Sequence, residues 1–132
     1  MRTKYVLASI ATILPAMGWL LLTAGPAHAE KPIKDQFKAK YVRPESGDPK
    51  QAALARAFQA ASCGVCHVGD DKKQRNAYGR ELAKLLGHKD VKDSRKTQDA
   101  LDKVASQKSD PADPNSPTFG EKIAQGKLPA AP

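Results

Sequence analysis

The sequence contains few of the side chains that usually build a hydrophobic core. The first 29 residues are mostly apolar and differ in this from the rest of the chain. The remaining 103 residues include only 16 Leu, Ile, Val or Phe. Methionine and tryptophan are absent from these 103 residues. Chains with so low a share of large apolar residues tend to stay disordered unless a disulfide, a metal or a bound group adds to the core. About 100 residues make one domain at most, so we expect one small domain that needs such a supplement.

The first 29 residues are typical of a secretory signal peptide. Arg2 and Lys4 give a basic start, an apolar stretch runs from Tyr5 to about Gly25, and an Ala-x-Ala sequence ends at Ala29. We therefore predict that residues 1–29 direct export to the periplasm or cell envelope and are then removed. The apolar stretch is about long enough to span a bilayer, so we expect membrane attachment only if this segment is retained.

The only two cysteines stand in the sequence Cys63-Gly64-Val65-Cys66-His67. C-x-x-C-H is the pattern of covalent c-type haem attachment. Each thiol adds to one vinyl group on one edge of the porphyrin while the adjoining imidazole reaches the iron, and this spacing on a helical turn lets both happen at once. Burying several hundred Å² of macrocycle at about 25 cal/mol per Å² would contribute on the order of 10 kcal/mol. Haem would therefore supply the missing part of the core.

Three other roles for the cysteines are weaker. A thioredoxin-like redox couple needs alternating strands and helices, a pattern that is not found here. A structural zinc site needs four ligands, whereas the mature chain has only two cysteines and two histidines, and the spacing of His67 and His88 does not match a zinc finger. A disulfide between residues so close in sequence would close a very short loop and stabilise little.

On the residues Cys63 to His67, the chain resembles the small exported c-type cytochromes that carry a single haem. The resemblance implies one haem c per chain, attached covalently through Cys63 and Cys66, with His67 as the proximal iron ligand. It also implies a mostly helical wrap around the haem and one-electron transfer by a carrier rather than by an enzyme. We accordingly predict an all-α fold, a small cytochrome c-like helical domain around one covalent haem.

The sixth iron ligand is the least determined part of this prediction. Many members of the family use a methionine, and the mature chain has none. His88 is the only other histidine after the signal peptide, 21 residues beyond His67, and is our candidate; a bis-histidine haem has a lower potential than a His/Met haem. Water, an open position, a lysine, Asn76 or Tyr78 are alternatives. An open site would favour binding of small ligands or reaction with peroxide.

Apolar residues recur at helical spacing in several segments. We predict helices over Lys50–Ser62, Gln74–Leu86, Ser94–Gln107 and Thr118–Leu128. A polar turn is expected at Val68–Lys73, and a loop at 109–117, because three prolines at a spacing of three exclude a helix there. The mature chain is thus divided into a polar N-terminal extension (30–48), a haem-binding helical domain (49–128) and a tail (129–132).

The mature chain is basic, with 20 Lys and Arg against 14 Asp and Glu. Lysines around an exposed haem edge would steer the protein to a redox partner with an acidic docking surface, although a merely solvated surface explains the mixed charges equally well. Nucleic-acid binding is not expected of an exported chain with so few aromatic residues. An electron carrier is the leading prediction; a haem protein with an open sixth site and a non-redox interaction subunit with structural haem are the alternatives.

Overall fold

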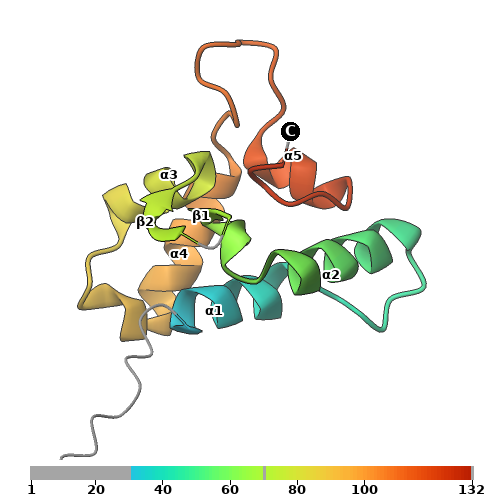
Figure 1. Cartoon of the computed structure of the whole chain (residues 1–132), viewed down its shortest axis with the longest axis horizontal. Helices are drawn as coiled ribbons and strands as arrows, with labels where there is room; N and C mark the ends of the chain where they lie inside the picture. Colours follow the sequence, from blue (N-terminus) through green and yellow to red (C-terminus); the bar gives the residue numbers. More distant parts are fainter. Residues whose placement is uncertain (1–30, 70, 132) are drawn as a thin grey trace, which may run out of the picture.

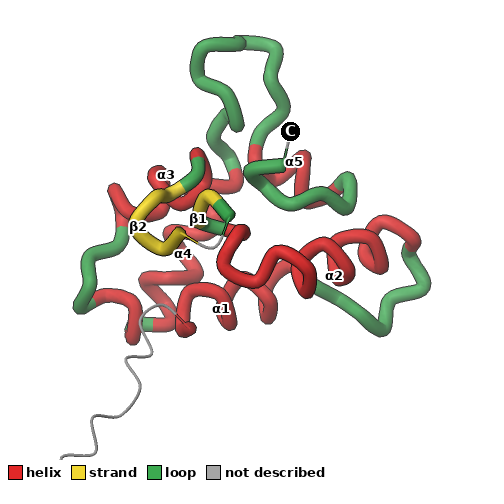
Figure 2. The backbone as a smooth tube through the Cα atoms, viewed as in Figure 1, coloured by secondary structure: helices red, strands yellow, loops and turns green. Residues whose placement is uncertain are grey.

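The computed structural model describes residues 31–69 and 71–131, and the predicted signal peptide, residues 1–29, lies outside them. Within these ranges the chain forms five α-helices and one two-stranded sheet (Figures 1 and 2). The helices are α1 (Lys31–Tyr41), α2 (Pro49–Ala61), α3 (Ala77–Leu85), α4 (Ser94–Ala105) and α5 (Phe119–Ala124). Two 3₁₀ turns, η1 (Ser62–Val65) and η2 (Asp90–Lys92), follow α2 and precede α4.

Side-chain caps explain where four of the helices begin. Asp48, Asn76 and Asp93 each accept a hydrogen bond from a backbone N–H in the first turn of α2, α3 and α4, as N-cap residues do. Thr118 and Glu121 form a reciprocal capping box at the start of α5. The four predicted helices are therefore confirmed, although α3 begins three residues later and α5 ends four residues earlier than the apolar spacing predicts.

The prediction of an all-α domain is wrong, because the segment after the C-x-x-C-H motif forms a β-hairpin. Strand β1 (His67–Val68) pairs antiparallel with β2 (Asp71–Arg75), so that His67 lies opposite Arg75. All five residues of β2 are exposed. Such a strand has no alternation of apolar and polar residues, which is why the sequence predicts a polar turn for this segment.

The core is centred on α4, which packs against α1, α3 and α5. Three aromatic side chains from the surrounding helices meet there: the ring of Tyr78 lies 5.9 Å from that of Phe37 and 5.2 Å from that of Phe119, between centroids. Leu54, Leu101 and Val104 are fully buried beside them. The described helices pack on one another through these side chains and do not show the predicted cytochrome c-like wrap around a haem, so that part of the fold prediction is corrected as well.

Both ends of the described chain contribute to this core. Phe37, within the predicted extension 30–48, is 1% exposed, and Pro129, in the predicted tail 129–132, is also fully buried. The loop at 109–117 is confirmed. It projects from the end of α4 (orange in Figure 1) and is closed at its base by the bridge between Lys108 and Thr118.

Candidate functional site

The C-x-x-C-H motif begins where α2 ends (Figure 1). Ser62 has a φ of +48°, which a non-glycine residue rarely adopts, and turns the chain from α2 into η1. Cys63 lies in η1, Cys66 directly after it, and both are half-buried. His67 follows as the first residue of β1 and is 6% exposed. The two cysteines therefore share one tight turn, and the histidine leaves that turn on a strand.

Helix α3 lies directly against the backbone of the motif. A Cβ atom added at Gly79 would lie 2.0 Å from the carbonyl oxygen of Cys66 and 2.9 Å from its carbonyl carbon, so only glycine permits this approach. The same oxygen accepts a hydrogen bond of 3.0 Å from the backbone N–H of Asn76. The first turn of α3 thus fixes the position of the second cysteine.

The side chain of Asn76 contacts both α3 and the motif. Its Oδ1 accepts a hydrogen bond of 2.9 Å from the N–H of Gly79, which caps the helix. Its Nδ2 donates to the carbonyl oxygens of Gly64 (3.0 Å), Val65 (3.1 Å) and His67 (3.3 Å). Asn76 was considered above only as an alternative iron ligand, and its contacts with the motif were missed. The available signal is the preference of Asn for the position before a helix, but the helix predicted to begin at Gln74 places Asn76 inside its first turn.

Tyr78, another alternative ligand, is a core residue with an exposed fraction of 0%. Its hydroxyl group is buried without a hydrogen-bond partner among the described residues. Burial raises the pKa of the phenol far above its ordinary value, and the charges of Tyr41, Cys66 and Asp102 raise it further. The phenol therefore stays protonated well above the pH at which an exposed tyrosine ionises.

His88, the candidate sixth ligand, is exposed in the turn that follows α3. Asn76 holds the first turn of α3 against the motif, whereas His88 comes after the last turn. A helix of 9 residues is about 14 Å long at 1.5 Å per residue. The structure therefore places His67 and His88 at opposite ends of α3 and does not bring them together.

The described residues contain no cluster of metal-ligating side chains, at the motif or elsewhere. Within residues 31–69 and 71–131, no three His, Cys, Asp or Glu side chains gather closely enough to hold a metal ion. No helix in these ranges is long and apolar enough to cross a membrane.

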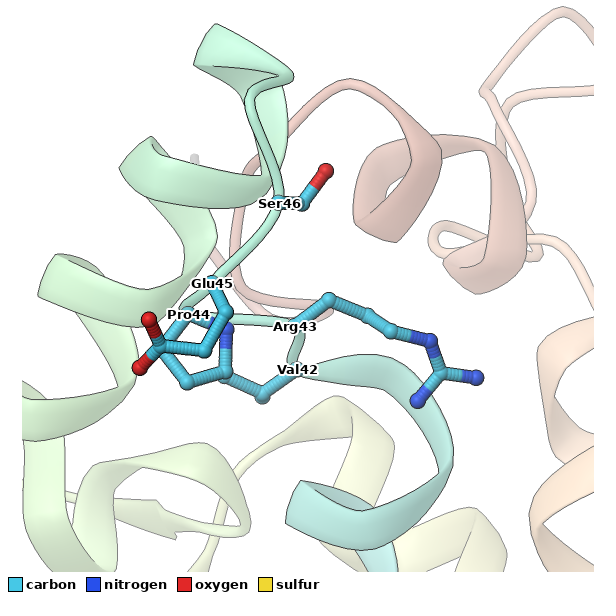
Figure 3. Close-up of a pocket in the computed structure, with 5 residues that line it drawn as sticks. All are labelled: Val42, Arg43, Pro44, Glu45 and Ser46. Carbon is cyan, nitrogen blue, oxygen red and sulfur yellow. The ribbon is translucent and has the colours of Figure 1, made fainter.

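Figure 3 shows a surface hollow in the loop before α2, lined by Val42, Arg43, Pro44, Glu45 and Ser46. The 13 residues of α2, about 20 Å of helix, lie between this loop and the motif. The hollow is therefore separate from the candidate site.

Comparison with known proteins gives no relative of this chain. No protein-family model matches it, and neither does any curated protein or solved structure. The motif and the residues around it are therefore the whole basis for a functional proposal.

Proposed function

We propose that the mature chain is an exported c-type haem protein that carries single electrons. One observation supports this above all: Cys63 and Cys66 lie half-buried on one turn with His67 directly after them, and α3 anchors the backbone of that turn. Two thiols followed by an imidazole are the donor set that attaches haem covalently and ligates its iron. When bound, haem supplies one-electron exchange between ferric and ferrous iron.

The surroundings of the motif fit such a group in two respects. Half-buried thiols can be reached from outside and still hold an attached group against the protein. The buried hydroxyl of Tyr78 has no acceptor among the described residues, and leaving such a group unsatisfied costs about 1–3 kcal/mol. A polar substituent of a bound molecule would accept its hydrogen bond and remove that cost.

Each residue of the donor set has its own task in this proposal. Cys63 and Cys66 would each hold the porphyrin through a thioether, which forms when the S–H group adds across a vinyl group, sulfur to one carbon and hydrogen to the other, with no oxidant. His67 would ligate the iron through its imidazole. The attached macrocycle adds apolar surface to a chain that has only 16 large aliphatic or Phe residues among 103.

The position of His88 supports a second candidate function. This histidine is exposed in the turn after α3, so its imidazole is not buried as an axial ligand of haem would be. If it does not bind the iron, the sixth position is open or weakly occupied, and the protein binds small ligands or reacts with peroxide. Carbon monoxide distinguishes the two functions, because it binds ferrous iron only where a coordination position is free or easily vacated.

We further propose that the electron-transfer partner presents an acidic surface to the hairpin beside the motif. Strand β2 is fully exposed and carries Lys72, Lys73 and Arg75, and the apolar side chain of Val68 on β1 is 53% exposed beside it. A basic rim around an apolar spot favours association that is steered by charge. Replacing Lys72 and Lys73 with Glu should slow reduction by an acidic donor at low salt by at least tenfold. A rate that is unchanged and insensitive to salt would contradict this docking surface.

Absorption spectra of the purified exported protein test the electron-carrier function. We expect low-spin ferric haem whose reduced form does not bind carbon monoxide, and no covalent haem in a variant with both cysteines replaced by alanine. A high-spin spectrum with rapid carbon monoxide binding would instead support the open-site function. In a low-spin protein, His88→Ala should produce a high-spin spectrum if His88 is the ligand, and an unchanged spectrum would remove it from the site.

A further inference from the structure

Four consecutive backbone carbonyls of the motif converge on one residue. The carboxamide nitrogen of Asn76 donates to the carbonyl oxygens of Gly64, Val65 and His67, and the backbone N–H of Asn76 donates to that of Cys66. The nitrogen has two hydrogens and three acceptors, so at least one hydrogen is shared.

A helix cap alone does not explain this arrangement. Asn, Asp and Ser are about equally good N-cap residues, and the capping task at Asn76 uses only the side-chain oxygen. The other half of the carboxamide is turned toward the motif. Asp has no N–H group to donate, and the shorter Ser has one hydroxyl hydrogen, so neither can replace both donors.

We propose that Asn76 is the positioning residue of the haem-attachment segment. It holds the backbone of residues 64–67 at one point, so that the two thiols and the His67 imidazole keep a fixed relative placement. The proposal rests on the proposed function, because it assigns this placement to haem attachment and iron ligation. Gly79 supports the arrangement by letting α3 approach the Cys66 carbonyl.

The first test uses the wild-type protein and needs no variant to fold. The sequence contains only two asparagines, Asn76 and the exposed Asn115, which makes the second an internal control. Hydrogen exchange of the two carboxamide groups, followed by NMR on the exported chain, should be at least tenfold slower for Asn76. Equal exchange rates would show that the Asn76 carboxamide is not held by the motif and would overturn the proposal.

The second test compares Asn76→Ser with Thr118→Ala. The first variant keeps a good cap on α3 but loses the carboxamide donors, and the second loses a cap on α5, away from the motif, and so controls for lost stability. We expect Asn76→Ser to contain at least threefold less covalent haem and its remaining haem to have an altered spin state and reduction potential, with neither changed in Thr118→Ala. Identical haem content and spectra in the two variants would refute the positioning role.

The outcomes of the two proposals remain distinguishable. Wild-type protein without covalent haem would refute the proposed function itself. Wild-type protein with haem, together with an Asn76→Ser variant that matches the Thr118→Ala control, would refute only the role of Asn76.

Discussion

Gly79→Ala is the substitution for which the structure gives the sharpest steric expectation. The added Cβ would lie 2.0 Å from the carbonyl oxygen of Cys66 and 3.2 Å from its Cα. A carbon atom approaches an oxygen to about 3.3 Å even in a weak hydrogen bond, so α3 and the motif must separate by about 1.3 Å. The contact is with backbone, which no rotation of a side chain can relieve.

The cost of that separation follows from the bonds that cross it. Moving α3 away by about 1.3 Å would stretch the four hydrogen bonds from Asn76 to the motif, now 3.0–3.3 Å long, beyond 4 Å. At about 1 kcal/mol for each bond, the loss is about 4 kcal/mol. Alanine regains about 1 kcal/mol through its higher helix propensity. We therefore expect the free energy of unfolding to fall by about 3 kcal/mol.

Urea unfolding followed by circular dichroism at 222 nm measures this change. Gly64→Ala is the matched control, because it adds the same methyl group within the motif and its Cβ would meet only the Cβ of Ala61, at 3.4 Å. We expect the control to change stability by less than about 1 kcal/mol. If Gly79→Ala proved no less stable than Gly64→Ala, the close approach of α3 to the Cys66 carbonyl would be refuted.

Three further predictions concern buried or paired titratable groups. Tyr78→Phe should lower the stability of the haem-loaded protein by about 1 kcal/mol if the hydroxyl donates to the bound group, and an unchanged or higher stability in chemical denaturation would contradict that bond. Burial and then the charge of Asp102 raise the pKa of Tyr41 to about 12, and burial raises the pKa of Tyr78 further. The contribution of these two tyrosines to stability should therefore be constant below pH 10 and fall above it, by up to about 1.4 kcal/mol per pH unit and tyrosine. A flat profile of urea midpoints from pH 9 to 11 would refute this. Hydrogen bonds with Thr118 lower the pKa of the Glu121 carboxyl below its ordinary value of 4.5. The ionised carboxylate therefore stabilises the fold above that pH, and this contribution is lost as the pH falls. Glu121→Gln should accordingly flatten the fall in Tm between pH 6 and 3, and an unaltered pH profile would count against the capping box.

Four of the five described helices could be predicted from the sequence because their signals are local, whereas α1 lies in the segment predicted to be a polar extension. Apolar spacing and the caps Asp48, Asp93 and Thr118 mark three helices that the structure confirms. Strand β2 could not be predicted in this way, because all its residues are exposed and its pairing with His67 and Val68 depends on the conformation of the motif.

The residues that would attach the haem could be predicted from the sequence, but the residues of α3 that hold the motif in place could not. Cys63, Cys66 and His67 are adjacent in the chain, so their pattern is visible without a structure. The contacts of Asn76 and Gly79 with the motif depend on how α3 packs, and neither residue differs in the sequence from an ordinary cap or an ordinary helical glycine. For the same reason, the distance between His67 and His88 could not be judged from their spacing of 21 residues.

The intact mass of the protein, expressed with its predicted signal peptide and denatured after purification, tests the central claim most directly. Covalent attachment through Cys63 and Cys66 predicts a chain that begins at Glu30 and is heavier than its sequence by one haem, even after extraction with acid and organic solvent. After proteolysis, the added mass should remain on the peptide that contains both cysteines. A mass equal to that of the polypeptide alone would contradict the account.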